Sequence, residues 1–115
     1  MIITHIQTTC NDSDVGTKDI YIEISRIRDG SKIYNSRTGY LGHHQQQGAY
    51  SWTERLPKSV KNEDAYLLLC LNKQNLYRRS IKYTTFCPHD FEVEKPNRLN
   101  FEVDVYDILM EVSWE

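Results

Sequence analysis

Alternation of apolar and polar residues is the dominant pattern along this chain, and it predicts strands. Between Ile20 and Ser25, three isoleucines alternate with tyrosine, glutamate and serine. The same two-residue period runs from Leu99 to Tyr106 and from Ile108 to Trp114. Successive side chains of a strand point to opposite faces, so this pattern is typical of half-buried strands. Over the whole chain it predicts about eight strands and at most a turn or two of helix.

Turn residues predict two hairpins. Asp29-Gly30 separates two apolar segments, and this dipeptide favours the positive φ angles of a type I′ turn. We therefore expect residues 24–28 to pair antiparallel with residues 31–35. A second hairpin is expected between Leu99–Val105 and Ile108–Trp114.

Two further segments suggest where the sheets end and where the core lies. A strand beginning at Tyr50 is expected to end before Pro57, because proline cannot donate to a ladder. Tyr66–Leu71 is continuously apolar, which suits a central strand covered on both faces. The residues expected to be buried are Ile22, Leu69, Phe101, Val103 and Val112, and Leu69→Ala is expected to cost about 2–5 kcal/mol.

The size of the chain and the spacing of its strands together predict one all-β domain. The chain has 115 residues, a length typical of a single core, so residues 1–115 are taken as one domain. Aromatic residues make up 11% of it, and they favour strands. Short strands separated by turns indicate an antiparallel two-sheet β-sandwich of about eight strands, an architecture in which Greek-key connections are common.

Antiparallel strands also place the loops. Successive connections must alternate between the two ends of such a sandwich. One end is expected to gather the loops Cys10–Asp19, Thr38–Ala49, Asn72–Asn75 and Tyr106-Asp107. The other end is expected to gather Asp29-Gly30, Pro57–Asp64 and Cys87–Asn97.

Charge and cysteine content narrow the partners. The formal net charge of −2 provides no long-range positive field for nucleic acid or anionic lipid, so neither is an expected partner. No leader pattern or long apolar run is visible, which predicts a cytoplasmic protein without integral membrane association. Three cysteines without a CxxC pair predict free thiols.

The first loop end carries the candidate metal ligands. Asn11-Asp12-Ser13-Asp14 offers oxygen atoms at alternate positions, a donor type that holds calcium when other loops add carboxylates. The ligand set would be Asp12, Asp14, Asp19 and Asp107. Such a site resembles those of calcium-binding sandwiches of the C2 and PLAT type in architecture only, without a matching motif. The simpler interpretation, which we favour, is that these residues are suited to turns, so no cofactor is expected and calcium is the alternative.

The same end carries the candidate partner-binding loop. Its polar run lies between glycines and two tyrosines, and the residues proposed to contact a partner are Tyr40, His43, His44, Gln46 and Tyr50. Adjacent histidines on an extended chain point to opposite faces, which is poor geometry for one metal. Exposed loops of this kind provide adaptable polar contacts, although solvated filler is the simpler interpretation.

Catalytic signals are weak. Cys87 and His89 are two residues apart in a proline turn, a poor arrangement for a nucleophile and its base, and no other catalytic motif occurs. Arg78, Ser80 and Lys82 alternate with Tyr77 and Tyr83, a pattern suited to binding single-stranded nucleic acid, but a solvated sheet face explains them more simply.

The function that best fits these observations is a non-enzymatic protein-binding module of the inhibitor, immunity or adaptor type. Its partner would be another protein, held at a loop end or on a sheet face. The alternative is a C2- or PLAT-like module that binds calcium, sugar or lipid near Asp12 and Asp14. A hydrolase acting through Cys87 and His89 is the third class.

Overall fold

The computed structural model describes residues 1–10, 19–35, 50–73, 79–104 and 106–114. Within these ranges the chain forms eight strands and one short 3-10 helix. One sheet has the order β4-β1-β8-β7, and its strands are β4 (Tyr50–Ser59), β1 (Ile2–Cys10), β8 (Tyr106–Ser113) and β7 (Arg98–Val103). The other has the order β3-β2-β5-β6, with β3 (Lys32–Asn35), β2 (Asp19–Arg26), β5 (Tyr66–Lys73) and β6 (Arg79–Phe86).

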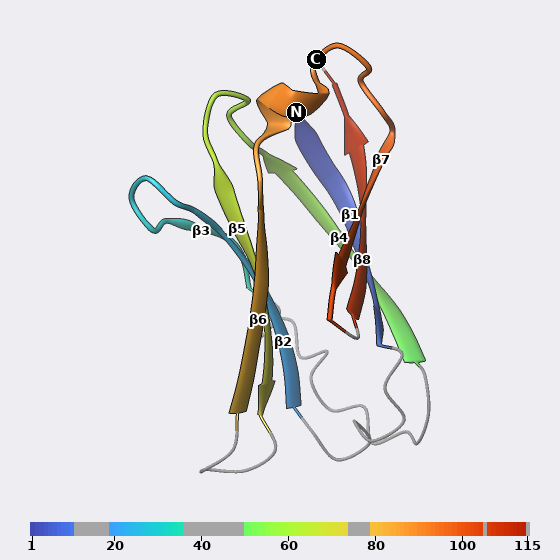
Figure 1. Ribbon diagram of the computed structural model, residues 1–115. Helices are drawn as coiled ribbons and strands as arrows, with labels where there is room; N and C mark the ends of the chain where they lie inside the picture. Colours follow the sequence, from blue (N-terminus) through green and yellow to red (C-terminus); the bar gives the residue numbers. More distant parts are fainter. Residues whose placement is uncertain (11–18, 36–49, 74–78, 105, 115) are drawn as a thin grey trace.

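The two sheets pack face to face, which confirms the predicted all-β sandwich (Figure 1). All neighbouring strands pair antiparallel. The loops that follow β2, β4 and β6 lie at the end that holds both termini, and η3 (Pro88–Phe91) lies in the last of them. The ends of β1, β5 and β7 lie at the opposite end, as the alternation of loops predicts.

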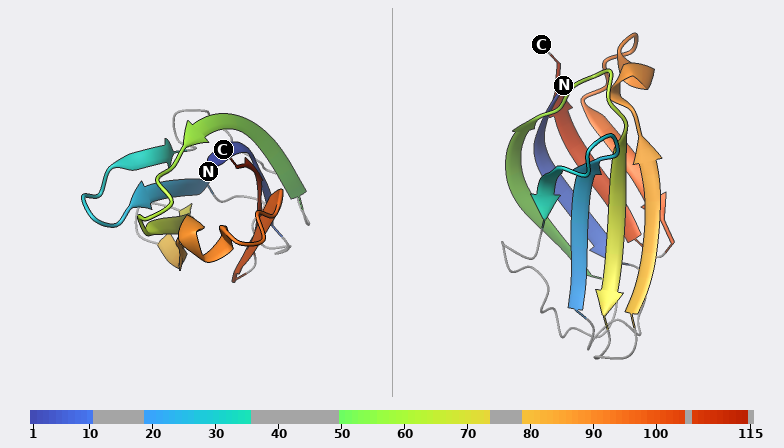
Figure 2. Two further views of the ribbon diagram at one scale, coloured as in Figure 1. Left: turned by 90° about the horizontal axis from the view of Figure 1, so that it is seen from above. Right: turned by 90° about the vertical axis from the view of Figure 1, so that its left-hand side faces the viewer.

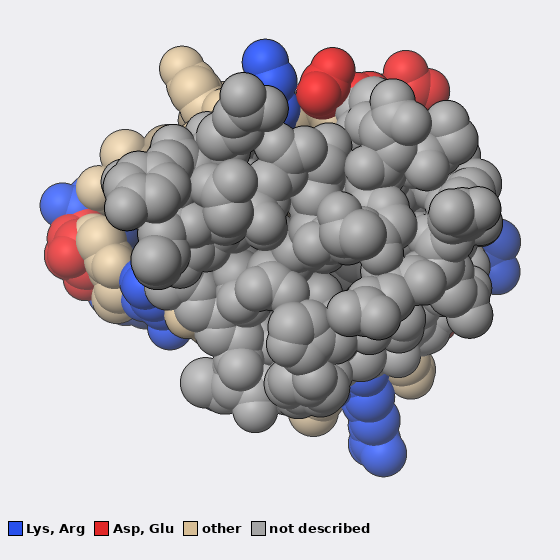
Figure 3. Space-filling view, turned by 90° about the horizontal axis from the view of Figure 1, so that it is seen from below, with Lys and Arg blue, Asp and Glu red and all other residues tan. Residues whose placement is uncertain are grey.

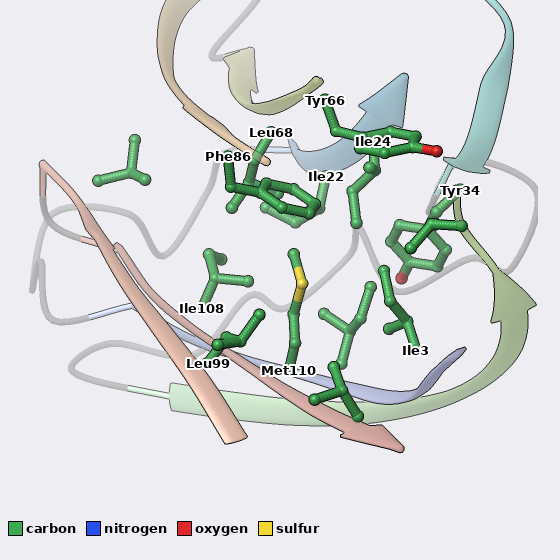
Figure 4. Packing of buried hydrophobic residues seen from close by; sticks show 14 of the residues in the cluster. Ile3, Ile22, Ile24, Tyr34, Tyr66, Leu68, Phe86, Leu99, Ile108 and Met110 are labelled. Atoms are coloured by element: carbon green, nitrogen blue, oxygen red, sulfur yellow. The ribbon is translucent and has the colours of Figure 1, made fainter. Parts of the chain in front are cut away.

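The core consists of the inward-facing residues of both sheets. In β8, Tyr106, Ile108, Met110 and Val112 are buried and the residues between them are only half-buried, so the predicted alternation is confirmed. Ile22, Leu68 and Phe86 of one sheet point toward Leu99, Ile108 and Met110 of the other (Figure 4). This interdigitation is the usual way in which two sheets share one core.

The prediction that β5 is covered on both faces holds only in part, because Leu71 on the outer face is buried whereas Leu67 and Leu69 are half-buried. Leu68 and Cys70 are fully buried, but Leu69 is only half-buried, as is Phe101 on β7. β5 is central within its sheet, between β2 and β6, but the opposite sheet covers only one face of it. Leu69 therefore points to the outer face of the sandwich, because neighbours along a strand alternate between faces.

The expected end of β4 at Pro57 is also wrong, since the strand continues to Ser59. β4 is an edge strand, so the missing N–H of Pro57 is tolerated there. The register with β1 also shifts near this point, between the pairs Ile3–Lys58 and His5–Arg55. Pro57 therefore lies where the pairing of this edge strand with β1 is irregular, and the strand continues beyond it.

The first hairpin is confirmed in its pairing but not in its turn type. β2 pairs with β3, and Gly30 has a φ of 72°, whereas Asp29 keeps a negative φ. The Gly30 N–H donates to the Arg26 carbonyl at 2.8 Å, which makes a wider turn than type I′. The Asp29 carboxylate closes it by accepting from Arg26 Nε and from the Ser31 N–H, both at 3.0 Å. These hydrogen bonds, first that of Arg26 and then that of Ser31, hold the pKa of Asp29 well below its ordinary value.

Acid is expected to weaken this turn. Because the pKa of Asp29 is lower in the folded chain than the ordinary 3.8, its contribution is present above that pH and is lost as the pH falls below it. In Asp29→Asn, part of this contribution is already missing at pH 7, so the melting temperature should start lower and fall less steeply between about pH 4 and pH 2. Melting curves across that range test this, with the exposed Glu94→Gln as the control for a lost surface charge. Parallel pH profiles for wild type and Asp29→Asn would show that the turn carboxylate does not contribute.

Candidate functional site

Most of the loop residues proposed as a site lie outside the described residues. They are Asp12, Asp14, Tyr40, His43, His44 and Gln46. The other three are at strand ends: Tyr50 begins β4, Asp19 begins β2 and Asp107 is the second residue of β8. The partner-binding role of the loop therefore stays a prediction.

The structure places two of the proposed calcium ligands in different sheets. Asp107 is paired in register with Thr9 of β1 and Glu102 of β7, whereas Asp19 is paired with Lys73 of β5. Among the described residues, no group of three or more histidine, cysteine, aspartate or glutamate side chains could hold a metal ion. Figure 3 shows this end from below, with Lys and Arg in blue and Asp and Glu in red visible around the outline of the view. The calcium hypothesis stays a prediction that depends on Asp12 and Asp14.

The opposite end, which carries Cys87 and His89, is held together by hydrogen bonds to Asn62. The backbone nitrogen of Met1 donates to Asn62 Oδ1 at 2.8 Å, and the His89 N–H donates to the Asn62 carbonyl at 3.0 Å. The Cys87 thiol donates to the same carbonyl at 3.5 Å, while His89 Nδ1 lies 3.0 Å from a carboxylate oxygen of Glu92. The thiol and the imidazole therefore have separate partners.

The outer face of the β4-β1-β8-β7 sheet is mostly polar. Thr4 Oγ1 donates to the Glu111 carbonyl at 3.0 Å, and the Glu111 carboxylate lies 3.3 Å from His5 Nδ1. On β7, Asn100 and Glu102 are exposed. Such a polar surface is stable in contact with water and does not require a partner to bury it.

The outer face of the other sheet has the opposite character over β5 and β6. Its residues, here called the β5–β6 face, are Leu67, Leu69, Leu71, Ile81 and Tyr83. Register pairs join them, because Leu69 lies opposite Tyr83 and Leu71 lies opposite Ile81. This sheet faces the viewer in the right-hand panel of Figure 2, with β6 at its edge.

Two side chains of the β5–β6 face are strongly exposed. Tyr83 retains 67% of its accessible surface and Ile81 retains 48%. Among the described residues, the Tyr83 hydroxyl has no hydrogen-bond partner. Tyr83 and Ile81 therefore form the exposed part of an apolar patch, beside the half-buried Leu67 and Leu69, whereas Leu71 is buried.

The sequence pattern of β6 predicts a strand but not an exposed apolar surface. The alternation around Lys82 and Tyr83 correctly predicts a strand, and in the structure Ile81, Tyr83 and Thr85 share one of its faces. The missing information was which face points inward. In the structure it is the face of Phe86, which is buried, so the tyrosine and isoleucine face solvent. The signal available in the sequence was the continuous apolar run of β5, because such a run leaves apolar residues on both faces of its sheet.

Neither a protein-family model nor a curated protein matches the sequence. The β5–β6 face is therefore the main guide to function. The described part of the chain contains no helix long and apolar enough to cross a membrane.

Proposed function

We propose that this chain is a non-enzymatic protein-binding module that holds another protein on the β5–β6 face. The observation that carries the proposal is the exposure of Tyr83 and Ile81 beside the half-buried Leu69. Burial of apolar surface stabilises a complex by about 25 cal/mol per Å², and aromatic side chains offer the largest areas.

The surroundings of the β5–β6 face fit the usual layout of an interface. Interfaces combine an apolar centre with a polar rim. On the β2–β3 side of the same sheet, Lys32 Nζ lies 3.7 Å from a Glu23 carboxylate oxygen, and Ser25 is half-buried. Thr85, exposed on β6, extends the polar rim toward the other end of the strand. A partner would therefore find an apolar centre with hydrogen-bonding groups around it.

Tyr83 is the expected anchor of the complex. Interface energy is concentrated in a few residues, with tyrosine among the commonest. We expect Tyr83→Ser to weaken partner binding by at least about 2 kcal/mol and to leave the melting temperature nearly unchanged, because the side chain is outside the core. The measurement is affinity capture from the cell of origin with wild type and variant side by side, followed by titration of the retained protein.

Two comparison variants make this test specific. Asn100→Ser changes an exposed residue of the polar outer face and should bind as wild type does. Deletion of residues 43–47, with a glycine bridge, removes the predicted partner-binding loop. Full binding by Tyr83→Ser together with loss of binding by the deletion would move the interface to the loop end and refute the proposal for the β5–β6 face.

A further inference from the structure

We propose that the β6 edge binds its partner by strand addition, taking up an extended segment that is apolar on one face and acidic on the other. This inference rests on the proposed function and names the kind of partner. Strand addition uses main-chain hydrogen bonds for affinity and alternate side chains for specificity. The edges, the exposed residues and the charge of β6 each support it.

Of the four sheet edges in the described chain, β6 is the longest without a proline or a register shift, although Lys82 places a charge on its inner face. β3 has only four residues and a register shift, and β4 carries Pro57 and another shift. β7 presents the exposed polar residues Arg98, Asn100 and Glu102. Short strands, proline, bulges and charges are the usual devices that block edge pairing. By contrast, β6 pairs with β5 in unbroken register from Arg79 to Phe86.

The edge of β6 is open to solvent. From residue 81 to residue 85, every residue except Thr84 is exposed. In an antiparallel ladder, every second residue of an edge strand directs its N–H and C=O away from its neighbour. The open stretch ends at Phe86, because the centroid of this ring lies 5.2 Å from that of Phe101 on β7 of the other sheet. The accessible pairing stretch is therefore residues 81–85.

Lys82 determines the charge that the added strand should carry. It lies opposite Cys70, which is fully buried, so its backbone position belongs to the inner face of the sheet, yet the residue is exposed. Within the described chain Lys82 has no ion-pair partner. An added strand would partly desolvate this ammonium group, which is costly opposite an apolar or cationic residue and favourable opposite a carboxylate.

The two faces of β6 thus require different side chains from the partner. Ile81 and Tyr83 on the outer face favour apolar residues, and Lys82 on the inner face favours an acidic one. A second copy of this chain fits less well, because β6 contains Arg79 and Lys82 but no acidic residue. The occupant that matches is an acidic strand of another protein.

Two capped octapeptides test this directly on the full chain: acetyl-(Val-Glu)4-amide and acetyl-(Val-Lys)4-amide. Titration followed by NMR should shift the backbone amides of residues 79–85 with the glutamate peptide. The lysine peptide should bind about tenfold more weakly, since like charges across an interface repel. Lys82→Glu should reverse this preference, and its melting temperature, checked in parallel, should stay close to that of wild type because Lys82 is exposed.

Main-chain pairing is tested by N-methylation of the glutamate peptide. One version carries methyl groups on the valine amides and the other on the glutamate amides. Strand addition uses one edge of the peptide, so one of the two versions should lose binding. Full binding by both versions, an unchanged preference in Lys82→Glu, or no shifts up to about 1 mM peptide would each overturn strand addition. Loss of the captured partner in Tyr83→Ser would still support the proposed function in that case.

Discussion

Replacing Phe86 by alanine is expected to lower the free energy of unfolding by about 3–5 kcal/mol, the range for a large buried aromatic residue. Phe86 retains 5% of its accessible surface. Its ring lies 5.6 Å from that of Tyr66 on the same sheet and 5.2 Å from that of Phe101 on the opposite sheet. The side chain therefore links the two layers at the side where β6 approaches β7.

Urea denaturation of Phe86→Ala and Phe86→Leu measures this effect. Leucine keeps most of the apolar volume but not the ring contacts, which contribute about 0.5–1.5 kcal/mol beyond area burial. Phe86→Leu should thus be destabilised clearly less than Phe86→Ala. A cost below about 1 kcal/mol for the alanine variant would place the ring outside the core.

The second large effect distinguishes the two faces of β5. Leu68→Ala is expected to cost about 2–5 kcal/mol, because this fully buried side chain leaves a cavity between the sheets. Leu69→Ala removes the same atoms from the half-buried outer face, where water fills the space. Its cost should be less than about half of that of Leu68→Ala.

The adjacent pair provides its own control, since both substitutions change one strand by the same chemical group. Denaturation midpoints measured under identical conditions are sufficient. Equal costs at the two positions would mean that the outer face of β5 is packed as tightly as the core. A larger cost at Leu69 would indicate that Leu69, and not Leu68, faces the core.

Alternation was sufficient to predict the sandwich, because a two-residue period determines which residues of β2 and β8 face the core. It could not determine the facing of β5, where a continuous apolar run has no period. The apolar run is equally compatible with Leu68 or Leu69 in the core, and the structure buries Leu68. Pro57 shows a second limit: its tolerance depends on β4 being an edge strand, which is a property of strand order.

The candidate site was harder to predict for a related reason. Motifs in the sequence point to loops, where polar residues gather, and the candidate residues Tyr40 and Asp12 both lie in such loops. The β5–β6 face is formed by two strands, and its apolar character is apparent only when Leu69 is placed opposite Tyr83. Strand register, and which face of each strand points to the core, are properties of the tertiary structure. A search of the sequence for chemical motifs does not reveal such a surface.

The most direct test of the central claim, that a partner protein covers the β5–β6 face, is site-specific photo-crosslinking in the cell of origin. Benzoylphenylalanine replaces Tyr83 in one variant and Asn100, on the opposite outer face, in another. The account predicts an adduct with a second protein at position 83 and none at position 100. Equal adducts at both positions, or an adduct at position 100 alone, would contradict it.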